Sequence, residues 1–382
     1  MKKVLILVLL VLNSFSLSAK DEFSLESAKK QLVNDNINIA ISYQNYVSVK
    51  EQSRVKMLQL LPTITVDLLV SDYQYTILRS IIPEPTKYFD ALAAQSLAGA
   101  ANLNRVIVKK NLLEDLEKSY FLFQFHKETV ESLQSELSIR KVIAERSKEA
   151  FDLGAISFDD FYLAQRFVVA AKTNLVNATE VLKNDEFTLK LLLQSNDLSE
   201  FDLMVEDLYN ASLAFPADVN EAMDIAVKHS LEVEQFDYLI QAARKTKTGV
   251  AVSWISWGGV GFDYFAKVSV ARSEIKKLQL QKEKAIIGLR NQVATIYAEI
   301  EKLKEKLTFH NELLEMSKNE YARAQENYNN QLGTLLTLKA AEISLINVQR
   351  DSRRMQYDLE LKYLKLKRVI GANMLTNEIP KI

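Results

Sequence analysis

The chain contains no cysteine, and this absence excludes disulfides, thiolate metal sites and cysteine nucleophiles. It also excludes a lipid anchor attached at an amino-terminal cysteine. Glycine and proline are scarce, with 9 and 5 residues among 382. Because both residue types interrupt helices, their scarcity favours long uninterrupted helices.

An excess of either charge is also missing. The 48 basic and 49 acidic residues give a formal net charge of -1, and this balance offers no electrostatic basis for nucleic-acid binding. After its first residues, the sequence has no apolar run near the roughly 20 residues that a membrane-spanning helix needs.

The first 19 residues have the pattern of a secretory signal. Two lysines precede an unbroken apolar run from Val4 to Leu12, and small residues follow up to Ala19. This order is typical of a signal peptide, with an uncleaved membrane anchor as the alternative. We therefore expect residues 1–19 to be removed and the protein to be exported without a lipid anchor.

An apolar or aromatic residue recurs every seven positions in the second half of the chain. Residues with this spacing form one stripe along a helix, here called the seam, and such a stripe predicts a coiled coil. The series consists of Ile286, Val293, Ile300, Leu307, Leu314, Tyr321 and Tyr328.

The same pattern occurs 177 positions earlier. This offset places Leu116 on Val293, and it also places Ser157 on Thr334, beyond the end of the helix. Because 177 is not a multiple of seven, heptads alone would not produce this agreement. The sequence therefore predicts an internal duplication.

Each half of the chain is expected to repeat one plan: a helix, a β-prone segment, a long helix, a tight turn and a return helix. Gly154 and Gly333 mark the turns, since glycine commonly follows the end of a helix. The two glycines differ by two positions in the aligned frame, which predicts tips of different shape. The expected helices cover about residues 24–60, 102–153 and 158–193 in the first half, and 218–247, 268–332 and 335–370 in the second.

The predicted fold is mainly α, with two tandem repeats of coiled-coil hairpins and short β-strands. The repeats are expected at residues 20–200 and 218–371, with β-prone segments at 62–101 and 249–266, a linker at 201–217 and a tail at 372–382.

The two β-prone segments differ in length. Apolar and polar residues alternate from Ile64 to Val70, and two strands fit before the long helix. Alternation recurs from Val250 to Trp254, but the second segment has only 18 residues, from Gly249 to Ala266. A membrane-spanning β-strand needs about 9–11 residues, so two strands in the second segment would be too short to span.

In the order and spacing of its expected helices, turns and β-prone segments, the chain resembles the TolC-type outer-membrane efflux factors. Each repeat opens with a short helix-start motif, at Leu25 to Ala28 and at Val219 to Ala222. Leu60-Leu61-Pro62 is similar to the start of the family's first barrel strand, and Phe151 to Asp160 resembles its periplasmic tip.

Three features depart from the family pattern. The asparagine-proline of the first helix is replaced by Asn36-Ile37-Asn38, and the second repeat lacks a leucine-leucine-proline. The second tip lacks the family's acidic pair, and Lys339 and Glu342 stand near those places.

The resemblance implies a homotrimer whose hairpins form a tunnel across the periplasm below an outer-membrane barrel, which we expect to be reduced or missing here. It implies a passive export duct of a tripartite efflux or type I secretion system, with a periplasmic adaptor and an inner-membrane pump as partners. The alternative is a periplasmic coiled-coil scaffold that no longer forms a channel. An adaptor is not favoured, since adaptors of this kind have one hairpin and this chain has two.

The resemblance also points to functional residues. Asp159 and Asp160 either favour the helix dipole or form an acidic constriction at the tunnel mouth. Trp254 and Trp257, the only tryptophans, are expected as membrane-interface anchors, with packing in an equatorial region or between protomers as the alternative. The expected adaptor-docking residues at the tips are Gly154, Ser157, Asp159, Asp160, Gly333, Thr334 and Glu342.

No catalytic constellation is present in the sequence. The spacing of His126, His229 and His310 is not that of metal ligands. His126 and His310 fall at seam positions of the two long helices, where a polar residue more often fixes the register of a coiled coil than binds a metal. We therefore expect no enzyme activity, no metal and no cofactor.

Overall fold

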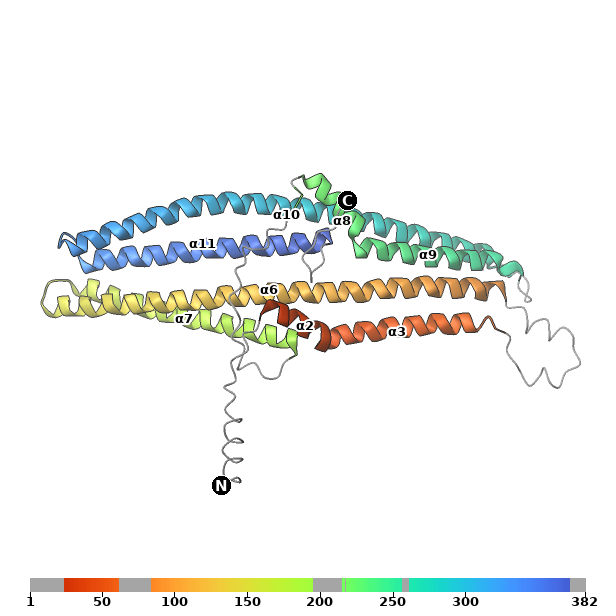
Figure 1. Ribbon diagram of the computed structural model, residues 1–382, viewed down its shortest axis with the longest axis horizontal. Coiled ribbons are helices and arrows are strands. Elements are labelled where there is room, and N and C mark those ends of the chain that lie inside the picture. The colour runs from red at the N-terminus through yellow and green to blue at the C-terminus, as the bar shows by residue number, and fades with distance from the viewer. Residues whose placement is uncertain (1–23, 62–83, 195–214, 217, 256–260, 372–382) are drawn as a thin grey trace, which may run out of the picture. The chain divides into compact units, whose positions relative to one another are not determined.

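The computed structural model describes residues 24–61, 84–194, 215–216, 218–255 and 261–371, whose regular structure is entirely helical (Figure 1). None of the helices in these residues is long and apolar enough to cross a membrane. The helices are α2 (Leu25–Asp35), α3 (Ile37–Leu58), α6 (Pro85–Asp152), α7 (Phe158–Leu193), α8 (Val219–His229), α9 (Leu231–Val252), the 3₁₀ turn η2 (Ser253–Ile255), α10 (Tyr264–Asn329) and α11 (Leu335–Ile370).

The chain divides into two compact units. Unit 1 comprises Met1–Asp35, Leu116–Asn210 and Glu312–Tyr357, and unit 2 comprises Asn36–Asp115, Ala211–Asn311 and Asp358–Ile382. The helices α6, α10 and α11 continue from one unit into the other. Both hairpin tips belong to unit 1.

The predicted duplication extends to the helix boundaries. Helices α7 and α11 each have 36 residues, and both their starts and their ends are 177 positions apart. Helices α6 and α10 end at Asp152 and Asn329, again 177 positions apart. Helices α2 and α8 have 11 residues each and α3 and α9 have 22 each, at an offset of 194 positions. The plan of two helical repeats is therefore confirmed.

The first helix of each repeat is broken where an unbroken helix was expected. Asn36 separates α2 from α3, and its side-chain Oδ1 accepts a hydrogen bond from the backbone N–H of Asn38 at 2.9 Å. Ser230 separates α8 from α9, and its Oγ accepts from the N–H of Val233 at 3.2 Å. Each side chain caps a new helix and so competes with continuation of the previous one.

The long helix of the first repeat begins earlier than predicted. Helix α6 starts at Pro85 instead of Asn102, so the β-prone assignment is wrong for residues 85–101. Proline is favoured in the first turn of a helix, and six alanines between residues 91 and 101 have the highest helix propensity. The alternating stretch from Ile64 to Val70 lies outside the described residues.

The strand expected from Val250 to Trp254 is also wrong. Residues up to Val252 continue α9, and Trp254 lies in η2. Packing within unit 2 explains the difference. A Cβ atom at Gly249 would lie 3.1 Å from the Cβ of Phe89 on α6, and the Tyr264 hydroxyl donates to the Ala251 carbonyl at 2.8 Å. Such contacts override β-propensity, which depends strongly on surroundings.

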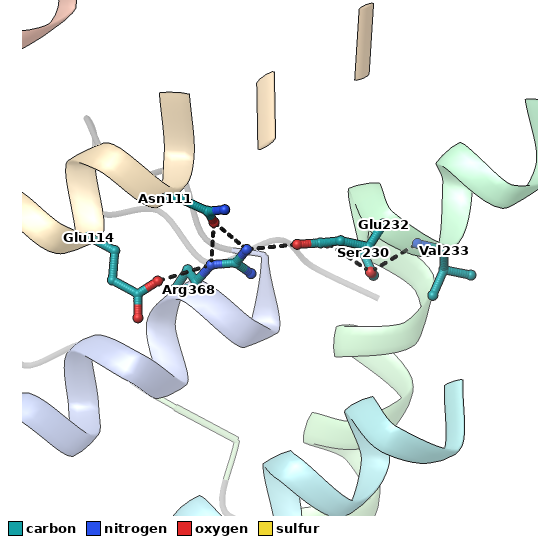
Figure 2. A network of polar contacts seen from close by, with 6 residues as sticks. All are labelled: Asn111, Glu114, Ser230, Glu232, Val233 and Arg368. Carbon is teal, nitrogen blue, oxygen red and sulfur yellow. Dashed lines mark hydrogen bonds and ion pairs between the residues drawn. The ribbon is translucent and has the colours of Figure 1, made fainter. Parts of the chain in front are cut away.

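Arg368, near the end of α11, joins three helices of unit 2 (Figure 2). Its Nε lies 3.0 Å from Asn111 Oδ1 and 3.0 Å from Glu114 Oε2, both on α6. Its Nη2 lies 2.7 Å from Glu232 Oε1 on α9. Burial alone raises the pKa of Glu232, but the hydrogen bond and charge of Arg368 bring this pKa below its ordinary value. Hydrogen bonds between charged groups are stronger than neutral ones, so this network fixes α11 on its neighbours.

Candidate functional site at the two hairpin tips

The first tip, residues 153–157, reverses the chain between α6 and α7. Gly154 has a φ of +71°, the left-handed conformation that glycine adopts without steric cost. The Ala155 N–H donates to the Ala150 carbonyl and the Gly154 N–H donates to the Phe151 carbonyl, each at 2.8 Å. These two bonds form a Schellman motif, which satisfies carbonyls at the end of α6.

Ser157 and Asp160 form the start of α7. The Ser157 Oγ accepts from the Asp160 N–H at 3.2 Å and donates to Asp160 Oδ2 at 2.7 Å. Asp159 and Asp160 both lie in the first helical turn, where a negative charge interacts favourably with the helix dipole. Ser157 is therefore the N-cap of α7, and the Asp160 carboxylate accepts a hydrogen bond from its hydroxyl.

The second tip, residues 330–334, has the same backbone form as the first. Gln331 has a φ of +60°, and the Leu332 N–H donates to the Asn327 carbonyl at 2.8 Å. These residues lie 177 positions after Gly154, Ala155 and Ala150. The prediction that the tips differ in shape is therefore wrong, because Gln331 and not Gly333 takes the left-handed position. The offset of 177 positions indicates the left-handed residue of the second tip, since it places Gln331 on Gly154.

The other predicted residues of the second tip lie at the start of α11. The Thr334 Oγ1 accepts from the Thr337 N–H at 3.2 Å and so caps this helix, as Ser157 caps α7. Glu342 lies two turns into α11 and forms an ion pair with Lys339 at 2.7 Å, with both side chains half-buried. Gly333 packs against Asn327, whose Cβ would be 3.2 Å from an added Cβ.

The side chains of the two tips differ although their backbones agree. At the first tip, the rings of Phe151 and Phe161 stack with centroids 5.3 Å apart, and those of Phe158 and Tyr162 stack at 5.9 Å. Sequence reasoning missed this aromatic cluster. The equivalent positions of the second tip hold one aromatic residue and three others: Tyr328, Leu335, Leu338 and Lys339.

A groove of about 630 Å³ lies beside the second tip. Its walls include Met316, Arg323 and Leu332, and it reaches Thr337 on α11. Leu332 is 80% exposed and Met316 is 67% exposed. The groove therefore offers apolar surface next to charged side chains, a combination suited to contact with another protein.

The remaining predicted residues lie apart from the tips. Trp254 is exposed in η2 of unit 2, and Trp257 lies outside the described residues. The carboxylate of Asp185 on α7 lies within hydrogen-bond distance of Nδ1 of His126 on α6. Among the described residues, no group of three or more histidine and acidic side chains is placed to hold a metal ion.

Several solved structures share this arrangement of helices. The outer-membrane protein VceC from Vibrio cholerae matches with a TM-score of 0.71 at 12% identity, over 92% of this chain and 96% of VceC. The Campylobacter jejuni outer-membrane channel CmeC matches with a TM-score of 0.73 at 10% identity, over 91% of this chain and 85% of CmeC.

The open state of the Neisseria gonorrhoeae outer-membrane channel MtrE matches with a TM-score of 0.72 at 14% identity, over 94% of this chain and 91% of MtrE. This chain has the fold of outer-membrane channels. The resemblance to TolC-type efflux factors is thereby confirmed at the level of the fold. No family model and no curated protein sequence matches the chain.

Proposed function

We propose that this chain is a divergent TolC-type protein that forms the export duct of a tripartite efflux or type I secretion system. The observation that carries the proposal is the pair of duplicated hairpins in a chain with the fold of outer-membrane channels. A duct of this kind acts passively as a homotrimer, and neither catalytic turnover nor a cofactor is part of the proposal.

The proposed location is the outer membrane, with the hairpins projecting into the periplasm. The signal pattern of residues 1–19 supports Sec-dependent export, and the absence of cysteine supports an unlipidated protein. In this arrangement the mature chain consists of the repeats at 20–200 and 218–371, joined by the linker at 201–217, and the tail at 372–382.

Fractionation of cells that express the chain tests the proposal. We expect the protein in the outer membrane, as a trimer that migrates as such on gels until the sample is heated. A monomer confined to the soluble periplasm would contradict the duct and would favour a coiled-coil scaffold of the same fold.

The two tips are the proposed docking site for a periplasmic adaptor that connects the duct to an inner-membrane pump. The groove beside the second tip, which combines apolar and charged side chains, and the exposed aromatic rings of Phe158 and Tyr162 at the first tip support this assignment. A photo-crosslinking residue at Asp159 or at Thr334 should capture the adaptor in cells. The same residue at exposed Lys172, in the middle of α7, serves as the control and should capture none.

Trp254 and Trp257 are the proposed anchors at the membrane surface. Tryptophan is enriched at membrane interfaces because its ring is amphipathic, and Trp254 is 58% exposed. In a Trp257→Phe variant, Trp254 is the only tryptophan that remains. Brominated lipids should then quench its fluorescence in reconstituted vesicles. An unchanged emission would instead favour packing between protomers.

A further inference from the structure

A hollow of about 550 Å³ lies in unit 2, beside the polar network of Figure 2. Part of its lining is apolar or without a side chain and belongs to α10, where Ala285 and Leu289 flank Gly288. Another part is charged and includes the carboxylates of Glu114 on α6 and Glu232 on α9. The hollow therefore joins an apolar surface to two acidic groups.

The hollow is open because α10 has a glycine at this position. A Cβ atom added at Gly288 would meet no other atom within 4 Å. The offset of 177 positions makes Asn111 of α6 the equivalent residue, and its side chain is filled into the network as the acceptor of Arg368. The second repeat thus leaves space where the first has a bonded amide.

The two carboxylates carry more charge than their shared partner neutralises. Figure 2 shows Glu114 and Glu232 on opposite sides of the Arg368 guanidinium, with N–O distances of 3.0 and 2.7 Å. Burial alone would raise the pKa of Glu232, but Arg368 holds this pKa below its ordinary value, so Glu232 stays ionised. Two carboxylates and one guanidinium leave one negative charge at the hollow. The carboxylate side chains are 26% and 41% exposed, so a ligand can reach them.

The nearby Lys110 offsets part of this negative charge. It lies one turn before Glu114 on α6 and does not line the hollow. Burial and the charge of Arg368 lower the pKa of Lys110 to about 8, so this ammonium group holds its proton weakly. A cation inside the hollow would therefore contact the carboxylates directly and would be repelled by Lys110 only from outside.

We propose that the hollow binds an organic cation, a protonated amine or amidine carried on an apolar body. The cationic group donates hydrogen bonds to the carboxylates of Glu114 and Glu232, and bonds between charged groups are the strong ones. The apolar body covers Ala285 and Leu289 and removes them from water. Small-molecule sites commonly have this combination, with volumes of about 300–1,000 Å³.

The site goes beyond the proposed duct, because all of its lining residues belong to unit 2 of a single copy of the chain. Binding therefore requires neither a second copy nor passage of cargo. A cation in the hollow contacts α6, α9 and α10 together, so it should stabilise the folded chain in proportion to its occupancy.

Two probes of the same size test the choice of a cation. The full chain, purified in detergent, is titrated with 4-aminobenzamidine, which is positively charged, and with 4-aminobenzamide, which is neutral. Isothermal titration calorimetry measures each affinity, and thermal unfolding measures the stabilisation. We expect saturable binding of the amidine and a rise in the thermal midpoint. The amide should bind about ten- to a hundred-fold more weakly, the difference that a hydrogen bond between charged groups makes.

Gly288→Leu tests the space in the hollow. Its leucine side chain would occupy the hollow, and the surroundings leave room for the new Cβ, so this variant should fold and lose amidine binding. Ala298→Leu adds the same side chain at an exposed position of α10 that does not line the hollow. This control should bind the amidine as the unaltered chain does. Circular dichroism confirms the folding of both variants.

Glu232→Gln tests the charge, and it is informative even if Gly288→Leu does not fold. Glutamine keeps the size of the side chain and removes its negative charge. The affinity for the amidine should fall by about ten-fold, whereas the weak affinity for the amide should stay the same. Lys110→Met removes the repulsion and should tighten amidine binding by about two- to five-fold, the range of a screened charge pair.

Three results would overturn the site. The first is equal affinity for the amidine and the amide, and the second is an unchanged amidine affinity in Glu232→Gln. The third is a folded Gly288→Leu variant that binds the amidine as well as the unaltered chain, since the probe would then lie elsewhere. Each of these results leaves the duct untouched, because fractionation and trimer migration test the duct separately.

Discussion

Lys29 on α2 forms a buried ion pair with Glu117 on α6 in the first repeat, with side chains only 9% and 1% exposed. The equivalent positions of the second repeat hold Met223 on α8 and Ala294 on α10. The same arrangement of helices thus holds a buried ion pair in the first repeat and apolar side chains in the second. Burying two charges costs desolvation energy that their attraction only partly offsets, so the ionic version need not be the more stable one.

Removal of one charge of this ion pair should have the largest effect on the stability of the protein. Lys29→Met takes away the counter-charge that the ion pair supplies to the Glu117 carboxylate. We expect the free energy of unfolding to fall by about 3–5 kcal/mol, the cost of breaking a buried pair. Urea unfolding followed by circular dichroism measures this change.

Two matched variants separate the charge from the packing. The double variant Lys29→Met/Glu117→Ala reproduces the second repeat and should recover most of the loss. Lys30→Met removes a partner of the exposed pair with Glu26, whose side chains are 72% and 77% exposed, and should change stability little. A double variant as unstable as Lys29→Met would show that the helices of the first repeat do not accept the apolar residues of the second at these positions.

Glycines in the two long helices should respond to alanine with opposite signs. In α6, a Cβ at Gly99 would lie 2.5 Å from Tyr238 Cδ1 on α9. Gly99→Ala should therefore destabilise the protein by about 1–3 kcal/mol, as overpacked cores do. In α10, a Cβ at Gly288 meets nothing within 4 Å. Gly288→Ala should stabilise the protein by about 0.5–1 kcal/mol, because alanine favours a helix. Equal shifts in thermal midpoint for both variants would refute this contrast.

The features that could be predicted from the sequence are those that the heptad pattern and its repetition determine. Seam residues such as Leu116 and Val293 are fully buried, at 0% exposure, because heptad spacing alone places them on one face of a helix. The turns and the return helices also followed from the pattern, since the offset of 177 fixed them together.

The features that sequence missed depend on single side chains and on tertiary contacts. The break at Asn36 requires one amide to cap a new helix, and helices tolerate asparagine elsewhere at modest cost. The helical path from Gly249 to Val252 depends on contact with Phe89, which lies far away in sequence. The left-handed Gln331 went unnoticed because glycine two residues later satisfied the usual rule.

Exchange of the turn residues tests whether the two tips share one backbone. Gln331→Gly should stabilise the second tip by about 1 kcal/mol, because glycine adopts a positive φ without strain. Gly154→Gln should destabilise the first tip by about the same amount. Hydrogen exchange of the Leu332 and Ala155 amides, which donate the turn bonds, reports each tip separately. Unchanged exchange in both variants would mean that these turns are not held as described.

A further small effect, which depends on pH, concerns the equivalent residues Glu360 on α11 and Lys183 on α7. Burial raises the pKa of Glu360 from 4.5 to about 7. The folded state then holds a proton that the unfolded chain has lost, so the stability contribution of Glu360 is complete below pH 4.5 and is lost as the pH rises to about 7. Glu360→Gln should remove this loss and stabilise the protein by about 1 kcal/mol at pH 8, after allowance for solvent screening.

The same substitution should leave stability at pH 4 nearly unchanged, since the carboxyl group is neutral there in both states. Lys183→Gln on the other return helix is the matched control, and its side chain is exposed, so its effect should not vary between these pH values. Thermal unfolding of both variants across pH 4 to 8 makes the comparison. If Glu360→Gln shifts the midpoint equally at all pH values, burial does not control the charge of Glu360, and the two return helices differ there only in sequence.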